Sequence, residues 1–222
     1  LDANTTADNN TAVGKSALGA NTTGDGNTAV GYTASDAITT GSNNVSVGLA
    51  ALTSDTLGNK SVAIGNYSLA YQNFTSATDT YNTAVGYEAG NRVTTGDANT
   101  LIGGLAGDAL TVGNGNVALG YASLSTDTKG DRNVAIGREA LFTQNFTTST
   151  DSYNTAVGYH AGQSVTTGVQ NTLIGGTAGD ALTDADYNVA VGYNALSSDT
   201  LGSMSVAIGY ETLKAQNFTS AT

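Results

Sequence analysis

The chain has 222 residues with no cysteine, tryptophan or proline, and its 18 acidic and 7 basic side chains give a formal net charge of -11. The lack of cysteine excludes a disulfide framework and a thiolate metal site. Nucleic acid is not an expected partner, because binding to its phosphates needs clustered cations. No apolar run approaches the roughly 18 residues of a membrane span, so we expect no membrane contact by this segment.

A five-residue phrase, Asn-Thr/Val-Ala-Val/Ile-Gly, recurs twelve times along the chain. Successive copies begin 17, 17, 17 and then 21 residues apart, and this series repeats every 72 residues. A short fixed period indicates stacked coils that bury apolar surface only against their neighbours. We therefore expect residues 1–9 to end a preceding coil and residues 10–222 to form a single β-solenoid of twelve coils, in blocks 10–81, 82–153 and 154–222.

Each phrase predicts a short β-strand, and the fold class is all-β. When coils are numbered from the opening Asn or Ser, the second and fourth positions carry β-branched or aliphatic residues, which share one strand face. We expect this face to point into the core. The third and fifth positions, mostly Ala and always Gly, form a smooth second face that another backbone can approach.

The opening Asn of most coils predicts a ladder of stacked side-chain amides. The repeat columns assign a structural role to Asn27, Val30, Gly31, Asn82, Val85, Gly86, Asn154, Val157 and Gly158.

The remainder of each coil predicts a second wall. The ninth position, often Leu and otherwise mainly Gly, predicts a second, shorter strand. Gly at the fifteenth position of eight of the nine 17-residue coils predicts a turn with positive φ. Because one coil encloses little apolar volume, we expect several chains to associate side by side, as a homotrimer.

The phrases resemble a known family. NTAVGYTA at 27–34, NTAVGYEAG at 82–90 and NTAVGYHAG at 154–162 resemble the head repeats of trimeric autotransporter adhesins (YadA-like heads) and the related repeats of phage and bacterial tail-fibre proteins. The resemblance covers the chain from Asn10 onward. It implies a left-handed parallel β-roll, three chains side by side, and an extracellular location on a bacterial cell surface or virion. It does not separate an adhesin head from a tail fibre.

The function that follows is a structural and adhesive one. We expect the segment to project from a cell or virion and to bind a host-surface protein or glycan. One alternative is a purely structural filament subunit that joins end to end through open strand edges.

A less favoured alternative is an ice- or calcium-binding solenoid. GGLAGDAL at 103–110 and GGTAGDAL at 175–182 depart from the calcium signature, and Val interrupts the Thr rank at the second position. We expect no enzyme activity, cofactor or metal site, because the single His160 occupies a variable column and the acidic residues follow the repeat.

The 21-residue coils are the expected place for binding, because binding residues concentrate on loops held by a rigid scaffold. Each carries Gln-Asn-Phe-Thr, and a Tyr closes the first two of them. Outward-pointing rings would offer stacking surfaces for a sugar or a partner protein; the alternative is that each Phe folds back and plugs a widened coil. The candidate binding residues are Phe74, Tyr81, Phe146, Tyr153 and Phe218.

Overall fold

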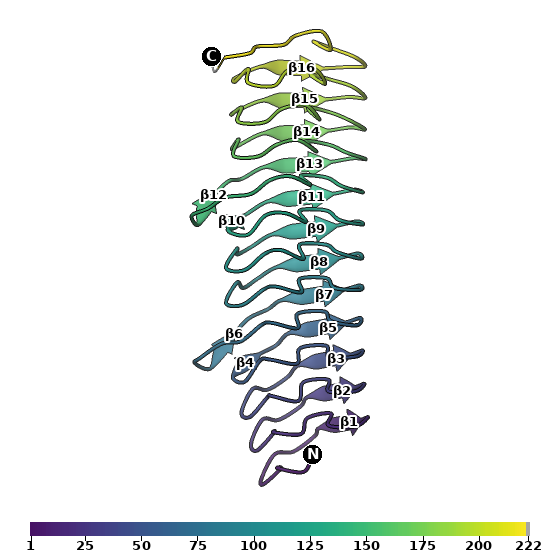
Figure 1. Ribbon diagram of the computed structural model, residues 1–222, viewed down its shortest axis with the longest axis vertical. Helices are drawn as coiled ribbons and strands as arrows, with labels where there is room; N and C mark the ends of the chain where they lie inside the picture. Colours follow the sequence, from purple (N-terminus) through teal and green to yellow (C-terminus); the bar gives the residue numbers. More distant parts are fainter. Residues whose placement is uncertain (221–222) are drawn as a thin grey trace. The chain divides into compact units, whose positions relative to one another are not determined.

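The computed structural model describes residues 1–220, which contain β-strands and turns and no helix (Figure 1). The chain divides into two compact units, Leu1–Val112 (unit 1) and Gly113–Thr222 (unit 2). In each unit one three-residue strand per coil stacks in parallel on the strand of the next coil, in register: Thr28 opposite Val45 in unit 1, for example, and Thr155 opposite Thr172 in unit 2. This confirms the predicted fold class, a parallel β-solenoid.

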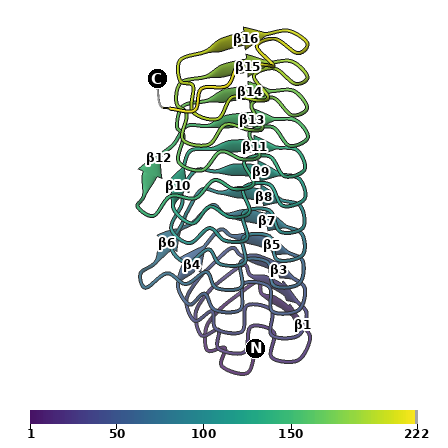
Figure 2. The same cartoon turned by 45° about the horizontal axis from the view of Figure 1, so that its top comes forward.

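The strands lie where the repeated phrase predicts them. Those of unit 1 are β1 (Thr11–Val13), β2 (Thr28–Val30), β3 (Val45–Val47), β5 (Val62–Ile64), β7 (Thr83–Val85) and β8 (Thr100–Ile102). Those of unit 2 are β9 (Val117–Leu119), β11 (Val134–Ile136), β13 (Thr155–Val157), β14 (Thr172–Ile174), β15 (Val189–Val191) and β16 (Val206–Ile208) (Figures 1 and 2).

The predicted orientation of these strands is wrong. The third residue of the phrase points inward, so that Ala29, Ala84 and Ala156 are completely buried. The second and fourth residues point outward, and Val30, Val85 and Val157 are only half-buried. The aliphatic column therefore lies on the surface of the solenoid, and the small residues line its interior.

The narrow interior explains this inversion. Where the ninth position of a coil is Leu, as in Leu52 and Leu69, that side chain fills the core, and the inward residue of the same coil is small, Ser46 or Ala63. In the coil that begins at Asn99, the third position is the large residue Leu101 instead. The ninth position is Gly107 in this coil and Gly90 in the coil before it. A Cβ added to Gly90 or Gly107 would lie 2.7 or 2.8 Å from a Leu101 methyl carbon. The coil has room for one large side chain here, which is why the phrase carries Ala.

The second wall is a turn instead of the predicted strand. Leu52 and Leu69 adopt positive φ values of 53° and 47°, and the residues two places before them, Ala50 and Tyr67, do so as well. Repeated left-handed residues cannot continue a strand, and they cost energy for a side chain with a Cβ. The gain from burying a leucine in the core offsets this cost.

The fifth-position glycines are required by close approach. Gly31, Gly86 and Gly158 all have φ of +143°, and a Cβ at Gly31 would lie 2.2 Å from the carbonyl oxygen of Gly48 in the next coil. The fifteenth-position glycines do not have the predicted positive φ. A Cβ at Gly24 would instead lie 2.1 Å from the carbonyl oxygen of Gly41, so close packing of successive coils selects glycine there too.

The opening asparagines form the predicted ladder, but mainly through the backbone. Asn27 Oδ1 accepts a hydrogen bond from Asn44 N at 2.9 Å, and Asn27 Nδ2 donates to Gly41 O at 2.8 Å. Asn82 and Asn154 repeat the pattern with Asn99 and Asn171, each at 2.9 Å. These completely buried amides satisfy backbone groups that the three-residue strands leave unpaired.

The long coils bulge from this regular wall, as predicted. In unit 1, β6 (Thr78–Asp79) pairs with β4 (Gly58–Asn59), and in unit 2, β12 (Thr150–Asp151) pairs with β10 (Gly130–Asp131). Figure 1 shows β6 and β12 protruding beside the main strands of their units. The residues just before them, 75–77 and 147–149, are exposed.

Candidate functional site

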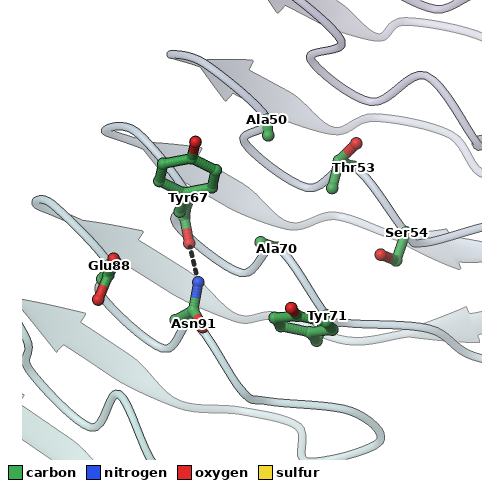
Figure 3. A pocket seen from close by; sticks show the side chains of 8 residues that line it. All are labelled: Ala50, Thr53, Ser54, Tyr67, Ala70, Tyr71, Glu88 and Asn91. Atoms are coloured by element: carbon green, nitrogen blue, oxygen red, sulfur yellow. Dashed lines mark hydrogen bonds between the residues drawn. The ribbon is translucent and has the colours of Figure 1, made fainter.

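A hollow of about 350 Å³ lies on the turn wall of unit 1 (Figure 3). The turns that follow β3, β5 and β7 each supply part of it, because the parallel register brings equivalent turn positions of successive coils side by side. The lining residues are Ala50, Thr53, Ser54, Tyr67, Ala70, Tyr71, Glu88 and Asn91.

The turn after β5 points two aromatic rings toward solvent. Leu69 and Ala70 are buried in the core, which leaves Tyr67 and Tyr71 on the outer surface, 39% and 60% exposed. Figure 3 shows the two rings on either side of Ala70. The site therefore has an apolar floor and two amphipathic walls.

Neighbouring contacts hold the site in shape. Asn91 Nδ2 donates a hydrogen bond to the backbone oxygen of Tyr67 at 3.0 Å. The Tyr67 ring packs edge-on against Tyr87, with 6.5 Å between ring centroids and 89° between planes. Hydrogen bonding to Glu88 raises the pKa of the Tyr87 hydroxyl, so the Glu88 carboxylate is held at the rim of the hollow.

A second hollow of about 370 Å³ adjoins the first. It shares Tyr71 and Asn91 with the first and adds Arg92, Thr94 and Thr111. The Tyr71 side chain thus stands between two neighbouring depressions, one with a carboxylate at its rim and one with a guanidinium.

None of the predicted phenylalanines lines the hollow, and two of the three are buried. Phe74 and Phe146 are each only 6% exposed, so the hypothesis that their rings point outward is wrong and the alternative, a plugged long coil, is correct. Phe218, in the corresponding position, is 42% exposed.

A polar network that the sequence did not reveal holds the first plug in place. Asp55 Oδ1 accepts from the backbone N of Phe74 at 3.3 Å, and Asp55 Oδ2 accepts from Gln72 Nε2 at 2.6 Å. Gln72 also donates to Ser61 Oγ at 2.8 Å and accepts from Asn82 Nδ2 at 2.9 Å. All four side chains are completely buried.

Unit 2 repeats this network around Asp127. Burial raises the pKa of the Asp127 carboxyl, against the opposing effect of hydrogen bonds from Gln144, Gly130 and Phe146. The sequence feature that could have predicted both networks is the recurrence of their Asp, Gln and Asn residues 72 positions apart.

Tyr81 and Tyr153 are exposed, as predicted, and each contacts a cation. Lys60 Nζ lies 2.6 Å from Asp79 Oδ2, 3.1 Å from the Tyr81 hydroxyl and 5.1 Å from the Tyr81 ring centroid. The hydrogen bond between Lys60 and Asp79 raises the pKa of the lysine and lowers that of the aspartate. In unit 2, Arg132 pairs with Asp151 and lies over the Tyr153 ring. Neither tyrosine lines the hollow.

His160 belongs to a small ionic cluster in unit 2. Its Nε2 lies 3.0 Å from Glu139 Oε2, and its ring stacks on Tyr159 with 3.7 Å between centroids. Burial raises the pKa of Asp180, and attraction to His160 opposes this effect. Within residues 1–220, no group of three or more His, Cys, Asp or Glu side chains is arranged to hold a metal ion.

The sequence interpretation missed the hollow residues Tyr67, Tyr71, Glu88 and Asn91. Their signal was a departure from the 72-residue repeat, since the equivalent positions in unit 2 are Glu139, Thr143, His160 and Gln163.

Among the described residues there is no helix long and apolar enough to cross a membrane. The chain matches no family model, no curated protein and no solved structure.

Proposed function

We propose that this chain is a segment of a trimeric extracellular fibre, an adhesin head or a tail fibre, displayed on a bacterial cell or a virion. In this function it projects from that surface and binds a receptor protein or glycan, without catalysis and without a cofactor. The observation that carries the proposal is the outward aliphatic column of the main strands.

This column presents apolar side chains to solvent where a monomer would be expected to carry polar ones. In unit 1, Ile64 is 38% exposed; in unit 2, Leu119 is 41% exposed and Ile174 39%. Exposed contiguous apolar surface marks a place where another molecule binds.

A second and a third copy of the chain are the occupants that we propose for this face. The column is regular in each unit, and the side chains beside it on the strand are Thr or Val, without charge. Because each chain carries a net charge of -11, two copies repel one another wherever their charged surfaces meet. A face without charged side chains is therefore the one best suited to contact between identical chains. The thin interior of Ala and single leucines gives a further reason for association, since each coil buries little apolar surface by itself.

The test is the mass of the folded segment in solution. The chain is expressed with a cleavable trimerising tag, and light scattering and circular dichroism are recorded before and after cleavage. We expect a β-rich trimer that persists without the tag. A folded monomer after cleavage would contradict the proposal.

Two variants locate the interface. Ile64→Lys in unit 1 and Ile174→Lys in unit 2 put a charge on the outward column, and each should dissociate the cleaved trimer. Thr95→Lys adds the same charge at an exposed turn position away from the column and should leave the trimer intact. If all three variants stay trimeric, the chains associate through another face.

A further inference from the structure

We infer that the paired hollows around Tyr71 form a saccharide-binding site, with a sugar ring stacked on the Tyr71 side chain and its hydroxyls bonded to Asn91 and Glu88. This inference deepens the proposed function, since it rests on the surface-binding role proposed above and names the site and the class of ligand. It differs from the sequence prediction, which placed binding in the long coils.

The size of the site is suited to a small ligand of one to a few rings. The two hollows, about 350 and 370 Å³, each lie near the lower end of the roughly 300 to 1,000 Å³ that is usual for small-molecule pockets. They are contiguous through Tyr71 and Asn91, so a disaccharide can place one ring on each side of the Tyr71 side chain.

The lining has the mixed character that a sugar requires. A pyranose ring offers one apolar C–H face and a rim of hydroxyls that both donate and accept hydrogen bonds. Tyr67 and Tyr71 supply exposed aromatic surface, and the side chains of Thr53, Glu88 and Asn91 supply acceptors and donors around it.

The polar groups are also held in position before a ligand arrives. The bond from Asn91 Nδ2 to the Tyr67 backbone fixes the amide and leaves the Asn91 carbonyl oxygen as an acceptor. The edge-on contact with Tyr87 restrains the Tyr67 ring. Preorganised rings and amides lose little entropy on binding, which matters for a weakly binding ligand in an open site.

The chemistry of the site argues against other small ligands. Glu88 lines the first hollow and Arg92 lines the second, so the lining of the pair carries no net positive charge; together with the net charge of -11, this disfavours a phosphate or another strong anion. Both hollows are open to solvent and several of their side chains are polar, which disfavours a lipid tail. A sugar ring is uncharged, and it can keep one side in water, so neither argument applies to it.

The site breaks the internal repeat, as expected of a specific function on a regular scaffold. At the positions equivalent to Tyr67 and Tyr71, unit 2 carries Glu139 with Thr143 in the second block and Glu211 with Ala215 in the third. The two tyrosines are therefore a property of unit 1 and are not needed to build a coil.

The experiment uses the trimer-tagged chain with cellobiose, chitobiose, maltose and lactose as soluble probes, followed by saturation-transfer difference NMR. We expect transfer to the ring C–H protons of at least one disaccharide. Tyr71→Thr, which installs the residue found at position 143, should weaken that binding roughly tenfold, and Tyr67→Ala should weaken it as well. Tyr187→Ala removes an exposed tyrosine of unit 2 and should leave binding unchanged.

Each outcome bears on one proposal alone. Absence of transfer from the folded protein to all four disaccharides, or equal binding by the wild type and both unit 1 variants, would overturn the saccharide site. Light scattering on the same samples after the tag is cleaved separates this from the fibre: a trimer without saccharide binding refutes the site only, and a monomer that binds saccharide refutes the fibre only. Circular dichroism of each variant shows that a loss of binding is not a loss of folding.

Discussion

The turn walls of units 1 and 2 are built on the same scaffold but carry different chemistry. In unit 1, Tyr67 and Tyr71 stand beside an open hollow with Glu88 and Asn91 at its edge. At the equivalent positions of unit 2, Gln163 Nε2 donates to Glu139 Oε2 at 3.0 Å and His160 lies 3.0 Å from the same oxygen. The polar groups of unit 2 bind one another, and those of unit 1 face a hollow.

The comparison teaches which columns a solenoid can vary. Inward Ala, buried Leu and close-packed Gly are repeated in both units, because each coil must fit against the next. The outward turn positions contact few neighbours, so they can differ without loss of the fold. We therefore expect changes in the scaffold to act alike in both units, and changes at the turn surface to act in only one of them.

The largest expected effect is on the scaffold. Gly86→Ala and Gly158→Ala should each destabilise the protein by at least about 3 kcal/mol, because a side chain is strained at this φ and the new Cβ clashes with backbone. Both glycines have φ of +143° and would place that Cβ 2.4 Å from a carbonyl oxygen of the next coil. Urea unfolding followed by circular dichroism measures the loss.

A matched control separates strain from the mere addition of a methyl group. Gly176→Ala adds a Cβ whose nearest neighbour is a Tyr193 ring carbon at 3.4 Å, and it should be nearly neutral. A clear difference between Gly86→Ala and Gly158→Ala would show that the two scaffolds are not equivalent.

The next effect concerns the buried carboxylates. Asp127→Asn should cost about 1 to 3 kcal/mol, since it replaces the acceptor of the Gln144 bond with a second donor. Burial raises the folded-state pKa of Asp127 above 3.8. The stability that the carboxyl contributes through this shift is therefore fully present below about pH 3.8 and is lost as the pH rises through the folded-state pKa. The difference between wild type and variant should be largest in acid.

The pKa of Asp199, in the same unit, is shifted in the opposite direction. Burial raises its pKa, but hydrogen bonds from Gln216, Phe218 and Gly202 outweigh this effect and leave the pKa below 3.8. Its contribution is present above about pH 3.8 and is lost as the pH falls through the folded-state pKa. Unfolding free energies of Asp127→Asn and Asp199→Asn across a pH series should therefore change in opposite directions; parallel curves would contradict the assignment.

A transplant tests whether the turn surface acts independently of the scaffold. Unit 2 would receive the unit 1 residues through Glu139→Tyr, Thr143→Tyr, His160→Glu and Gln163→Asn. We expect the unfolding free energy to fall by about 1 kcal/mol per position, because the Glu139 and His160 side chains are only 17% and 20% exposed. Saccharide binding measured by NMR titration should rise from one site per chain to two. Stability that falls severely would show that the ionic cluster helps to hold unit 2 together.

The smallest expected effect is at the bulges of the long coils. Lys60→Ala removes an ion pair with Asp79, and Arg132→Ala removes the equivalent pair with Asp151. Exposed pairs of this kind contribute little to stability, because water and salt screen them. Neither variant should shift the midpoint of thermal unfolding detectably. A clear drop in either would mean that the bulge supports its unit.

The sequence predicted the position of every main strand of the solenoid, because each copy of the phrase has a β-branched second residue and an aliphatic fourth residue before an invariant Gly. It also predicted that the opening Asn column would stack, as in Asn27 and Asn44, since a polar residue repeated at a coil period can satisfy its neighbours. The bulge of the long coils followed from four extra residues in an otherwise constant length.

The orientation of each strand was decided by the tertiary structure. Alternation shows that Val85 and Ala84 face opposite ways but not which of them faces inward. The choice depends on the width of the coil, which Leu69 and Leu101 fill from neighbouring positions. The tertiary structure also placed Phe74 inside the long coil, where the sequence left both orientations open.

The candidate site needed the structure for a related reason. Tyr67 and Asn91 are 24 positions apart, and only the stacking of coils brings the asparagine amide to the tyrosine backbone. The sequence by itself determined a parallel β-solenoid and its period, because those depend on residue type at a fixed spacing. Only the tertiary structure decided which face is the core and which residues meet on the surface, because both depend on how tightly successive coils pack.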